Sequence, residues 1–163
     1  MAQVDYFLKL DGVPGESVDA KHKGELDLES FSWGETNATS IGSATGGAGA
    51  GRVQAGDFVF TKRLDKASPM LFIACATGQH FKEALLTVRK AGGQQQEYLK
   101  IKMQTIFVTG YQTSGVEGGG GLIHEHVSMV CAKLEMSYKE QKPDGSLGGE
   151  TKQGYDFASN KKL

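Results

Sequence analysis

The sequence is poor in features that mark several common protein classes. Its 163 residues include only two cysteines, three prolines and one tryptophan. Two cysteines cannot build the disulfide framework of a small secreted domain. Because Cys75 and Cys131 both stand among apolar residues, we expect two buried, reduced thiols. A chain of this length can bury roughly two thirds of the surface that it exposes when unfolded, so it needs no covalent staple.

Excess charge of one sign is also lacking, as are long apolar runs. The 18 basic and 19 acidic residues leave a formal net charge of -1, which gives no broad attraction to nucleic acid. No apolar run approaches the roughly 20 residues of a membrane-spanning helix. The N-terminus lacks the apolar core of a signal peptide. We expect one domain over residues 1–163, without nucleic acid or membrane as a partner.

What the sequence does contain is alternation of polar and apolar residues, which is typical of half-buried β-strands. In residues 98–108, Leu99, Ile101 and Met103 alternate with polar side chains. The same period runs through residues 4–10, 25–33, 52–65, 85–93 and 126–139. Within residues 25–33 the apolar positions change parity, which indicates a bulge or a strand covered on both faces.

One segment has the pattern of a helix. Ser68 is a good N-cap, Pro69 suits the first helical position, and Gly78 suits the C-cap. The apolar residues between them predict a short, heavily buried helix that plugs one end of the sheet structure. With about seven strands and no helical crossovers, the strands are expected to be antiparallel. The fold class is therefore mainly β, a barrel or sandwich with one short α-helix.

A glycine-rich stretch, GGAGAGRV at residues 46–53, resembles a phosphate-binding loop only in part. Gly46 and Gly51 have the required spacing, but Arg52 and Val53 replace the lysine and the hydroxyl residue. A strand follows instead of a helix, so no helix dipole attracts phosphate. The stretch is interpreted as an extended arm that becomes ordered against a partner, or else as a merely flexible loop. A second glycine run, residues 118–121, predicts a hairpin connection.

Candidate catalytic and metal-binding residues are few. His124 and His126 fall on one face of a strand, but two ligands do not complete a zinc site, which needs three or four. No nucleophile elbow is present, so we expect no enzyme, no metal and no cofactor. Two alternatives remain open. One is an enzyme that uses the two histidines, and the other is a monomeric ligand-binding barrel. Its lining would be Phe58, Phe60, Leu99 and Met103.

The order of several segments is similar to one known family. They are DYFLKLDGVPGES at residues 5–17, SFSWG at 30–34, FTKRLDKASPML at 60–71, IACATGQHF at 73–81, LLTVRKAGG at 85–93 and QEYLKIKM at 96–103. These segments resemble the haemolysin co-regulated protein (Hcp), the tube protein of type VI secretion. The resemblance extends from Ala2 to about Phe157. The segments FTK-(x)2-DK-(x)-SP and TVRKAGG are the most specific.

The resemblance implies a fold, an assembly and a set of partners. The fold is two packed antiparallel sheets that form a barrel with one helix at its side, related to phage tail tubes. Six copies would form a ring, and rings would stack into a tube. A contractile sheath would surround that tube, and a spike protein would lie at its tip. Small effector proteins would bind inside the ring. The protein would stay in the bacterial cytoplasm until firing, and then leave without a signal peptide.

The resemblance also assigns roles to particular residues. A loop at about 37–52 would reach the adjacent ring, with Gly46, Gly47, Gly49, Gly51 and Arg52 as the stacking residues. Ser32 would face the lumen and contact cargo, while the neighbouring tryptophan would serve packing. The residues after 139 form a short polar tail, too short for a fused toxin domain. A plain tube subunit is therefore implied.

Overall fold

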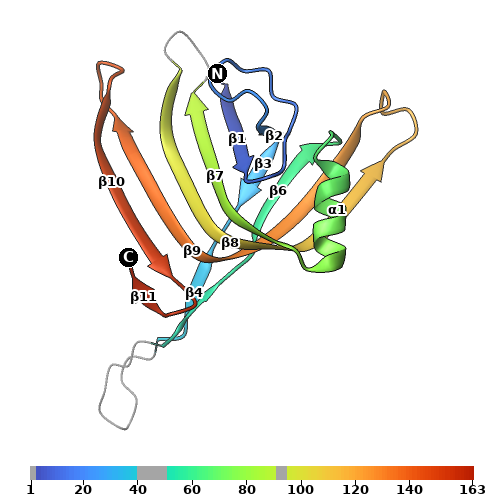
Figure 1. The fold of residues 1–163 in the computed structure, drawn as a ribbon. Helices are drawn as coiled ribbons and strands as arrows, with labels where there is room; N and C mark the ends of the chain where they lie inside the picture. Colours follow the sequence, from blue (N-terminus) through green and yellow to red (C-terminus); the bar gives the residue numbers. More distant parts are fainter. Residues whose placement is uncertain (1–2, 40–50, 91–94) are drawn as a thin grey trace.

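The computed structural model describes residues 3–39, 51–90 and 95–163 (Figure 1). In those ranges the chain is mainly β, with one helix, as the sequence predicts. The elements are β1 (Val4–Leu10), β2 (Leu26–Leu28), β3 (Ser30–Ser32), β4 (Glu35–Asn37), β5 (Val53–Ala55), β6 (Phe58–Arg63), α1 (Ser68–Thr77), β7 (His80–Lys90), β8 (Gln96–Gly115), β9 (Ile123–Gln141), β10 (Leu147–Asp156) and β11 (Lys161–Lys162).

The antiparallel pairings form a path whose two ends, β2 and β3, follow each other directly in the chain. β8 pairs with β7, β7 with β1, and β1 with β2. On the other side β3 pairs with β6, β6 with β9, and β9 with β8. Only Glu29 separates β2 from β3, and its backbone N–H donates to the carbonyl oxygen of Thr61 at 2.8 Å. The buried positions in residues 25–33 therefore change parity because the strand passes there from one sheet to the other.

The long strands β8 and β9 run through both sheets and bend between them (Figure 1). On β8, Ile101 and Met103 are buried, and then Ile106 and Val108 are buried, so the inward parity changes between the two pairs. Thr105 lies at the change and has a φ of 56°. This left-handed conformation is rare for a β-branched residue. The bend lets one strand supply apolar side chains to two sheets.

Replacing Thr105 with glycine is expected to stabilise the fold slightly, by up to about 1 kcal/mol. Relief of left-handed strain contributes roughly 1–2 kcal/mol, and the greater entropy of unfolded glycine offsets about 0.5–1 kcal/mol of it. Urea unfolding would measure the difference. Thr113→Gly, in the same strand but without a positive φ, serves as the control and should lose stability. Equal losses in both variants would contradict strain at Thr105.

The core lies between the two sheets and is built from the predicted alternating positions. Leu8 and Leu26 are fully buried, as are Phe60, Ile101 and Met103. Aromatic rings on neighbouring strands contact one another, with the centroids of Phe31 on β3 and Phe58 on β6 lying 6.0 Å apart. The core is therefore filled by side chains that the period-two pattern assigns to its inner face.

The helix α1 begins and packs differently from the prediction. Its N-cap is Ala67, and Ser68 is the first helical residue, because the Ser68 hydroxyl bonds to Glu125 instead of capping the helix. The predicted C-cap is confirmed, since Gly78 has a φ of 71° and its N–H donates to the Ala74 carbonyl oxygen at 3.0 Å.

The expectation of a heavily buried helix is wrong. Ser68, Leu71 and Ala74 are buried, whereas Phe72 is 57% exposed and Ile73 46% exposed. The helix rests with one face against the barrel, beside β8 (Figure 1). It covers the side of the barrel and leaves apolar side chains at the surface.

The C-terminal strands are a feature that the alternation does not predict. β10 pairs with the second half of β9, and β11 pairs with the end of β10. Lys161 and Lys162, expected in a polar tail, lie in β11 and are exposed. These strands extend one sheet beyond the barrel (Figure 1).

Two smaller expectations can be compared with the structure. Residues 116–122 connect β8 to β9 as a hairpin, and Gly118, Gly120 and Gly121 all have positive φ. Cys75 and Cys131 are both free and half-buried. Burial raises the pKa of the Cys131 thiol to about 11, so this cysteine remains a neutral thiol at physiological pH.

Candidate functional site

Ser32 is exposed at the end of β3 and belongs to a polar sheet face. It belongs to a row of residues that runs across four neighbouring strands. The row continues through Val59 of β6 and Ser128 of β9 to Gly110 of β8. We call the outward side of β3, β6, β9 and the end of β8 the Ser32 face. Its side chains alternate with the buried residues of the same strands, so it is the solvent side of a half-buried sheet.

Hydroxyl, amide and imidazole groups dominate this face. In the next row, Ser30, Thr61, His126 and Gln112 lie side by side, and the Ser30 and Thr61 hydroxyl oxygens are 2.6 Å apart. His124 lies two residues from His126 on β9, and its Nδ1 is 2.9 Å from a carboxylate oxygen of Glu29. A shallow hollow of about 370 Å³ covers part of this surface.

The sequence prediction that His124 and His126 share one strand face is therefore confirmed, and both are exposed. Sequence reasoning missed that they share it with Ser32, because the pairing of β3 with β6 and of β6 with β9 sets that relation. Among the described residues, no group of three or more His, Cys, Asp or Glu side chains is arranged to hold a metal ion. The face offers hydrogen bonds rather than a coordination site.

Beneath the Ser32 face lies a buried ionic network. The Lys62 ammonium, which is fully buried, donates to a Glu125 carboxylate oxygen at 2.7 Å and to Asp65 at 2.8 Å. The hydroxyls of Ser68 and Tyr111 also donate to Glu125. Burial raises the pKa of Glu125, but these three hydrogen-bond donors outweigh burial and hold it below its usual range. Burial and the Glu125 bond raise the pKa of Tyr111 to about 12.

This network ties the helix to the sheet. Ser68 belongs to α1, Lys62 to β6 and Glu125 to β9, so one cluster of charge-assisted bonds joins three elements. A buried charge that has partners on all sides fixes the position of those partners. The network therefore supports the Ser32 face from within.

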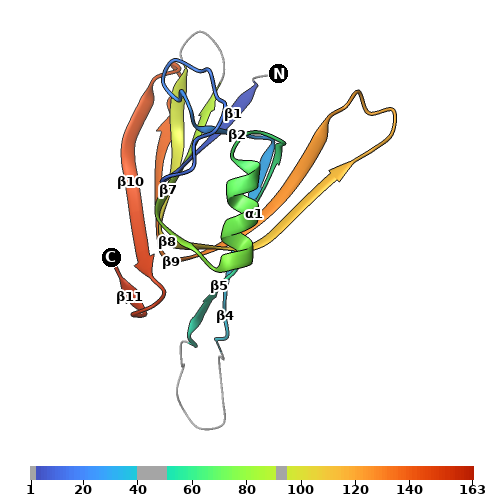
Figure 2. The same cartoon turned by 45° about the vertical axis from the view of Figure 1, so that its right-hand side comes forward.

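A two-stranded ribbon projects from the barrel, as Figure 2 shows. It consists of β4 and β5, with Thr36 opposite Gln54. Of the predicted stacking residues, Gly51 and Arg52 lie at the end of this ribbon, and Arg52 is exposed. Gly46, Gly47 and Gly49 lie outside the described residues. The described residues show a ribbon on either side of the predicted arm, whose stacking role stays a prediction.

Gly51 is required by a close backbone approach. A Cβ atom built on Gly51 would collide with the carbonyl oxygen of Ala38 and lie 2.7 Å from its carbonyl carbon. Only a residue without a side chain lets the two strands come this close. The sequence GRV at residues 51–53 thus has a structural role at the start of β5.

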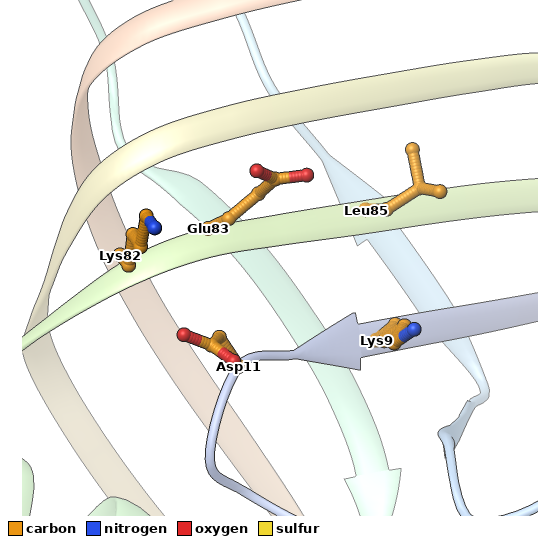
Figure 3. A pocket seen from close by; sticks show the side chains of 5 residues that line it. All are labelled: Lys9, Asp11, Lys82, Glu83 and Leu85. Carbon is orange, nitrogen blue, oxygen red and sulfur yellow. The ribbon is translucent and has the colours of Figure 1, made fainter.

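The surface hollow shown in Figure 3 lies elsewhere, on the other sheet. Lys9 and Asp11 line it from β1 and the residue after it, and Lys82, Glu83 and Leu85 line it from β7. It measures about 310 Å³. Its lysine and carboxylate side chains point to solvent, and Glu83 forms an exposed pair with Lys102 at 3.8 Å. A ligand pocket has a mainly apolar lining with a few convergent polar groups. This hollow does not fit that description, because four of its five lining residues are charged.

The ligand-binding barrel predicts that Phe58, Phe60, Leu99 and Met103 line a cavity. Phe58, Phe60 and Met103 are instead buried within the single core cluster, with Leu99 packed against it. Trp33 also packs against the core, and its ring lies 6.3 Å from that of Phe157. These side chains occupy the interior that a ligand would need.

The sequence comparison decides the family. A family model described as "Type VI secretion system effector, Hcp" matches residues 7–139. The chain belongs to the Hcp family. The resemblance drawn from the segments at residues 5–17 to 96–103 is thereby confirmed.

Individual relatives agree with this assignment. The chain is similar to "Protein hcp1" of Pseudomonas aeruginosa, at 41% identity over 96% of this chain and 97% of that protein. The crystal structure of Hcp1 from Salmonella typhimurium is 35% identical with a TM-score of 0.80, and covers 100% of both chains. A structure titled as a type six secretion system protein is 31% identical with a TM-score of 0.92, and covers 99% of this chain and 100% of that one.

This Hcp chain is a structural tube subunit of the type VI secretion system. A more distant likeness concerns the fold alone. The baseplate of the anti-feeding prophage contains a chain that is 9% identical, with a TM-score of 0.51 over 83% of this chain and 93% of that one. The Hcp fold is thus shared with a phage-like assembly. Within the described residues, no helix has the length and apolar character needed to cross a membrane.

Proposed function

We propose that six copies of this Hcp chain close into a ring and that the rings stack into the expelled tube. The observation that carries the proposal is the pairing of a polar, exposed sheet face with a projecting ribbon in one subunit. A ring needs a heterologous contact that closes by rotation. A stack of rings also needs an element that reaches beyond the ring, and the β4–β5 ribbon is such an element (Figure 2).

In this proposal the Ser32 face lines the lumen and holds small effector proteins. Its support is the row of exposed hydroxyl, amide and imidazole groups, which can hydrogen-bond to varied protein surfaces. The chain acts as one domain without catalysis or cofactor. Its further partners are the spike at the tube tip and the sheath around it. The protein is held in the bacterial cytoplasm and then secreted by the apparatus without a signal peptide.

The stacking residues of the proposal are Gly46, Gly47, Gly49, Gly51 and Arg52. Negative-stain electron microscopy with mass photometry on the same purified sample tests the assembly. Six-fold rings with an open centre are expected at micromolar concentration. A protein that stays monomeric at every accessible concentration would count against self-assembled rings and would favour a subunit that needs the rest of the machine.

Ser32→Gln is expected to leave rings intact and to reduce cargo retention by about tenfold or more. The longer side chain displaces partner groups from a contact surface, and the loss of one or two well-placed hydrogen bonds changes affinity by about this factor. Co-purification of a small effector with tagged rings measures retention. Ser137→Gln is the control, because Ser137 pairs with Lys100 on the other sheet. Normal retention by Ser32→Gln would remove Ser32 from the cargo site.

A further inference from the structure

The segment between β1 and β2, residues 11–25, folds back over the outer side of the barrel. Its own backbone closes it, because the Gly15 N–H donates to the Gly24 carbonyl oxygen at 2.8 Å and the Ser17 N–H to Glu25 at 3.0 Å. We call it the β1–β2 segment. His22, in its second half, is only 7% exposed. A histidine buried this far at the outer surface must be held by specific partners.

His22 lies flat on an aromatic ring and has an acidic partner at each nitrogen. Its ring stacks on Phe7 of β1, with centroids 4.3 Å apart and planes within 9°. Nδ1 is 2.8 Å from a carboxylate oxygen of Glu25. Nε2 is 2.7 Å from a carboxylate oxygen of Glu97, which belongs to β8 and lies 75 residues along the chain. The ring therefore joins the β1–β2 segment to two strands.

Hydrogen bonds from both ring nitrogens to two ionised carboxylates need a proton on each nitrogen. A neutral imidazole has one N–H and one lone pair, whereas an ionised carboxylate can only accept. If the ring were neutral, one of the two carboxylates would face a lone pair at hydrogen-bond distance. Only the imidazolium can donate to Glu25 and Glu97 together, and it then forms two charge-assisted bonds.

The surroundings keep the second carboxylate charged. Burial raises the pKa of Glu97, but hydrogen bonds from His22 and Lys100 outweigh burial and place it below its usual range. Further charged groups around the site come from each neighbouring element. They are Asp5 on β1, Asp27 on β2, Arg89 on β7, Lys100 on β8 and, within the segment, Asp19 and Glu25.

A second anchor of the segment does not depend on a proton near neutral pH. Arg89 donates to both carboxylate oxygens of Asp19, at 2.7 and 3.0 Å, and to Asp5 at 3.1 Å. Its guanidinium also lies 4.8 Å from the centroid of the Phe7 ring. The bond from Arg89 holds the pKa of Asp19 far below its usual range. The Asp19–Arg89 pair is therefore an anchor whose two charges do not change near neutral pH.

We propose that His22 is a proton-dependent clamp on the β1–β2 segment. As the imidazolium it bridges Glu25 and Glu97 and closes the segment over Phe7. When pH rises and the ring loses one proton, one of the two bonds is lost. The His22 end then opens while the Asp19–Arg89 anchor holds. The closed state is thus stabilised at low pH and loosened at high pH.

The test is a pH series of amide hydrogen exchange on the full chain, from pH 5.5 to 9, corrected for intrinsic exchange rates. Isotope-labelled histidine reports the His22 ring nitrogens by NMR in the same samples. We expect both nitrogens to be protonated at the acidic end. Protection of residues 15–24 should fall about tenfold or more as the ring loses a proton, since a charge-assisted bond is worth that factor. Protection in β9 should stay constant.

Two variants and a control complete the experiment. Glu97→Gln should lower protection of the segment at pH 6, and His22→Gln should make its exchange independent of pH. His124→Gln changes an exposed histidine on the Ser32 face and should leave the segment unaffected. A single ring proton on wild-type His22 at pH 5.5 would contradict the proposed clamp. It is equally overturned if protection of residues 15–24 stays flat while the ring titrates. The wild-type series decides this even if a variant fails to fold.

Discussion

Lys62→Ala is expected to destabilise the fold by about 3–5 kcal/mol, the usual cost of leaving a buried charge without its partner. Lys62 and Glu125 are directly opposite each other on β6 and β9, and neither side chain is accessible to solvent. Removing the ammonium leaves the Glu125 carboxylate with only the Ser68 and Tyr111 hydroxyls as donors. Urea unfolding at a fixed protein concentration measures the loss.

Two further variants show that the loss comes from the unpaired charge. Lys102→Ala removes an exposed ammonium 3.8 Å from Glu83, and should cost less than about 1 kcal/mol. Lys62→Met combined with Glu125→Gln removes both charges and should recover most of the stability. If Lys62→Ala were no more harmful than Lys102→Ala, the buried network would not stabilise the fold.

The same network predicts how stability changes with pH. The pKa of Glu125 is lower in the folded protein than its usual value, so the unfolded chain binds the proton more tightly. The contribution of Glu125 is therefore complete above the unfolded pKa and is lost as pH falls through the folded one. In Glu125→Gln this part of the acid dependence should disappear.

Gly51→Ala is expected to prevent ring stacking while leaving the barrel intact. The added methyl group would collide with the Ala38 backbone, so the ribbon that carries the proposed stacking loop must splay. Gly51 lies outside the core, so the cost of the collision falls on the ribbon and the barrel strands should keep their pairing. Electron microscopy of concentrated protein and release of the protein from secreting cells are the measurements.

A matched control is available at the base of the same ribbon. Gly34 precedes β4, and a Cβ atom there would meet no atom within 4 Å. Gly34→Ala should therefore stack and be secreted as the wild type is. Tubes of normal length from Gly51→Ala would refute the role of the ribbon in stacking, and equal defects in both variants would point to a general loss of fold.

Sequence reasoning was most successful where a local pattern determines the structure. The alternation in residues 4–10 and 98–108 identifies strands and their inner faces, and Gly78 marks the end of the helix. The start of the helix was misplaced because the Ser68 hydroxyl bonds to Glu125, 57 residues further along. A single sequence carries no signal for such a distant competitor.

The missed features share this dependence on distant partners. The three glycines and scattered polar residues of β10 give no strand pattern, and pairing with β9 makes this segment a strand. The Ser32 face could be predicted one strand at a time, from the parity of His124 and His126. Its assembly could not, because the register between β3, β6 and β9 joins segments far apart in the chain.

The order of strand pairing has a consequence for synthesis. β1 is translated first, yet its longest pairing is with the neighbouring strand β7, with Val4 opposite Lys90. At roughly 5–20 residues per second, β1 leaves the ribosome several seconds before β7 does. During that interval Leu8, which is buried in the finished barrel, can pair with Leu26 of the short β2, while its partner on β7 is not yet made. The N-terminal strand is therefore complete well before its main partner, and its apolar side chains become buried only when β7 has been made.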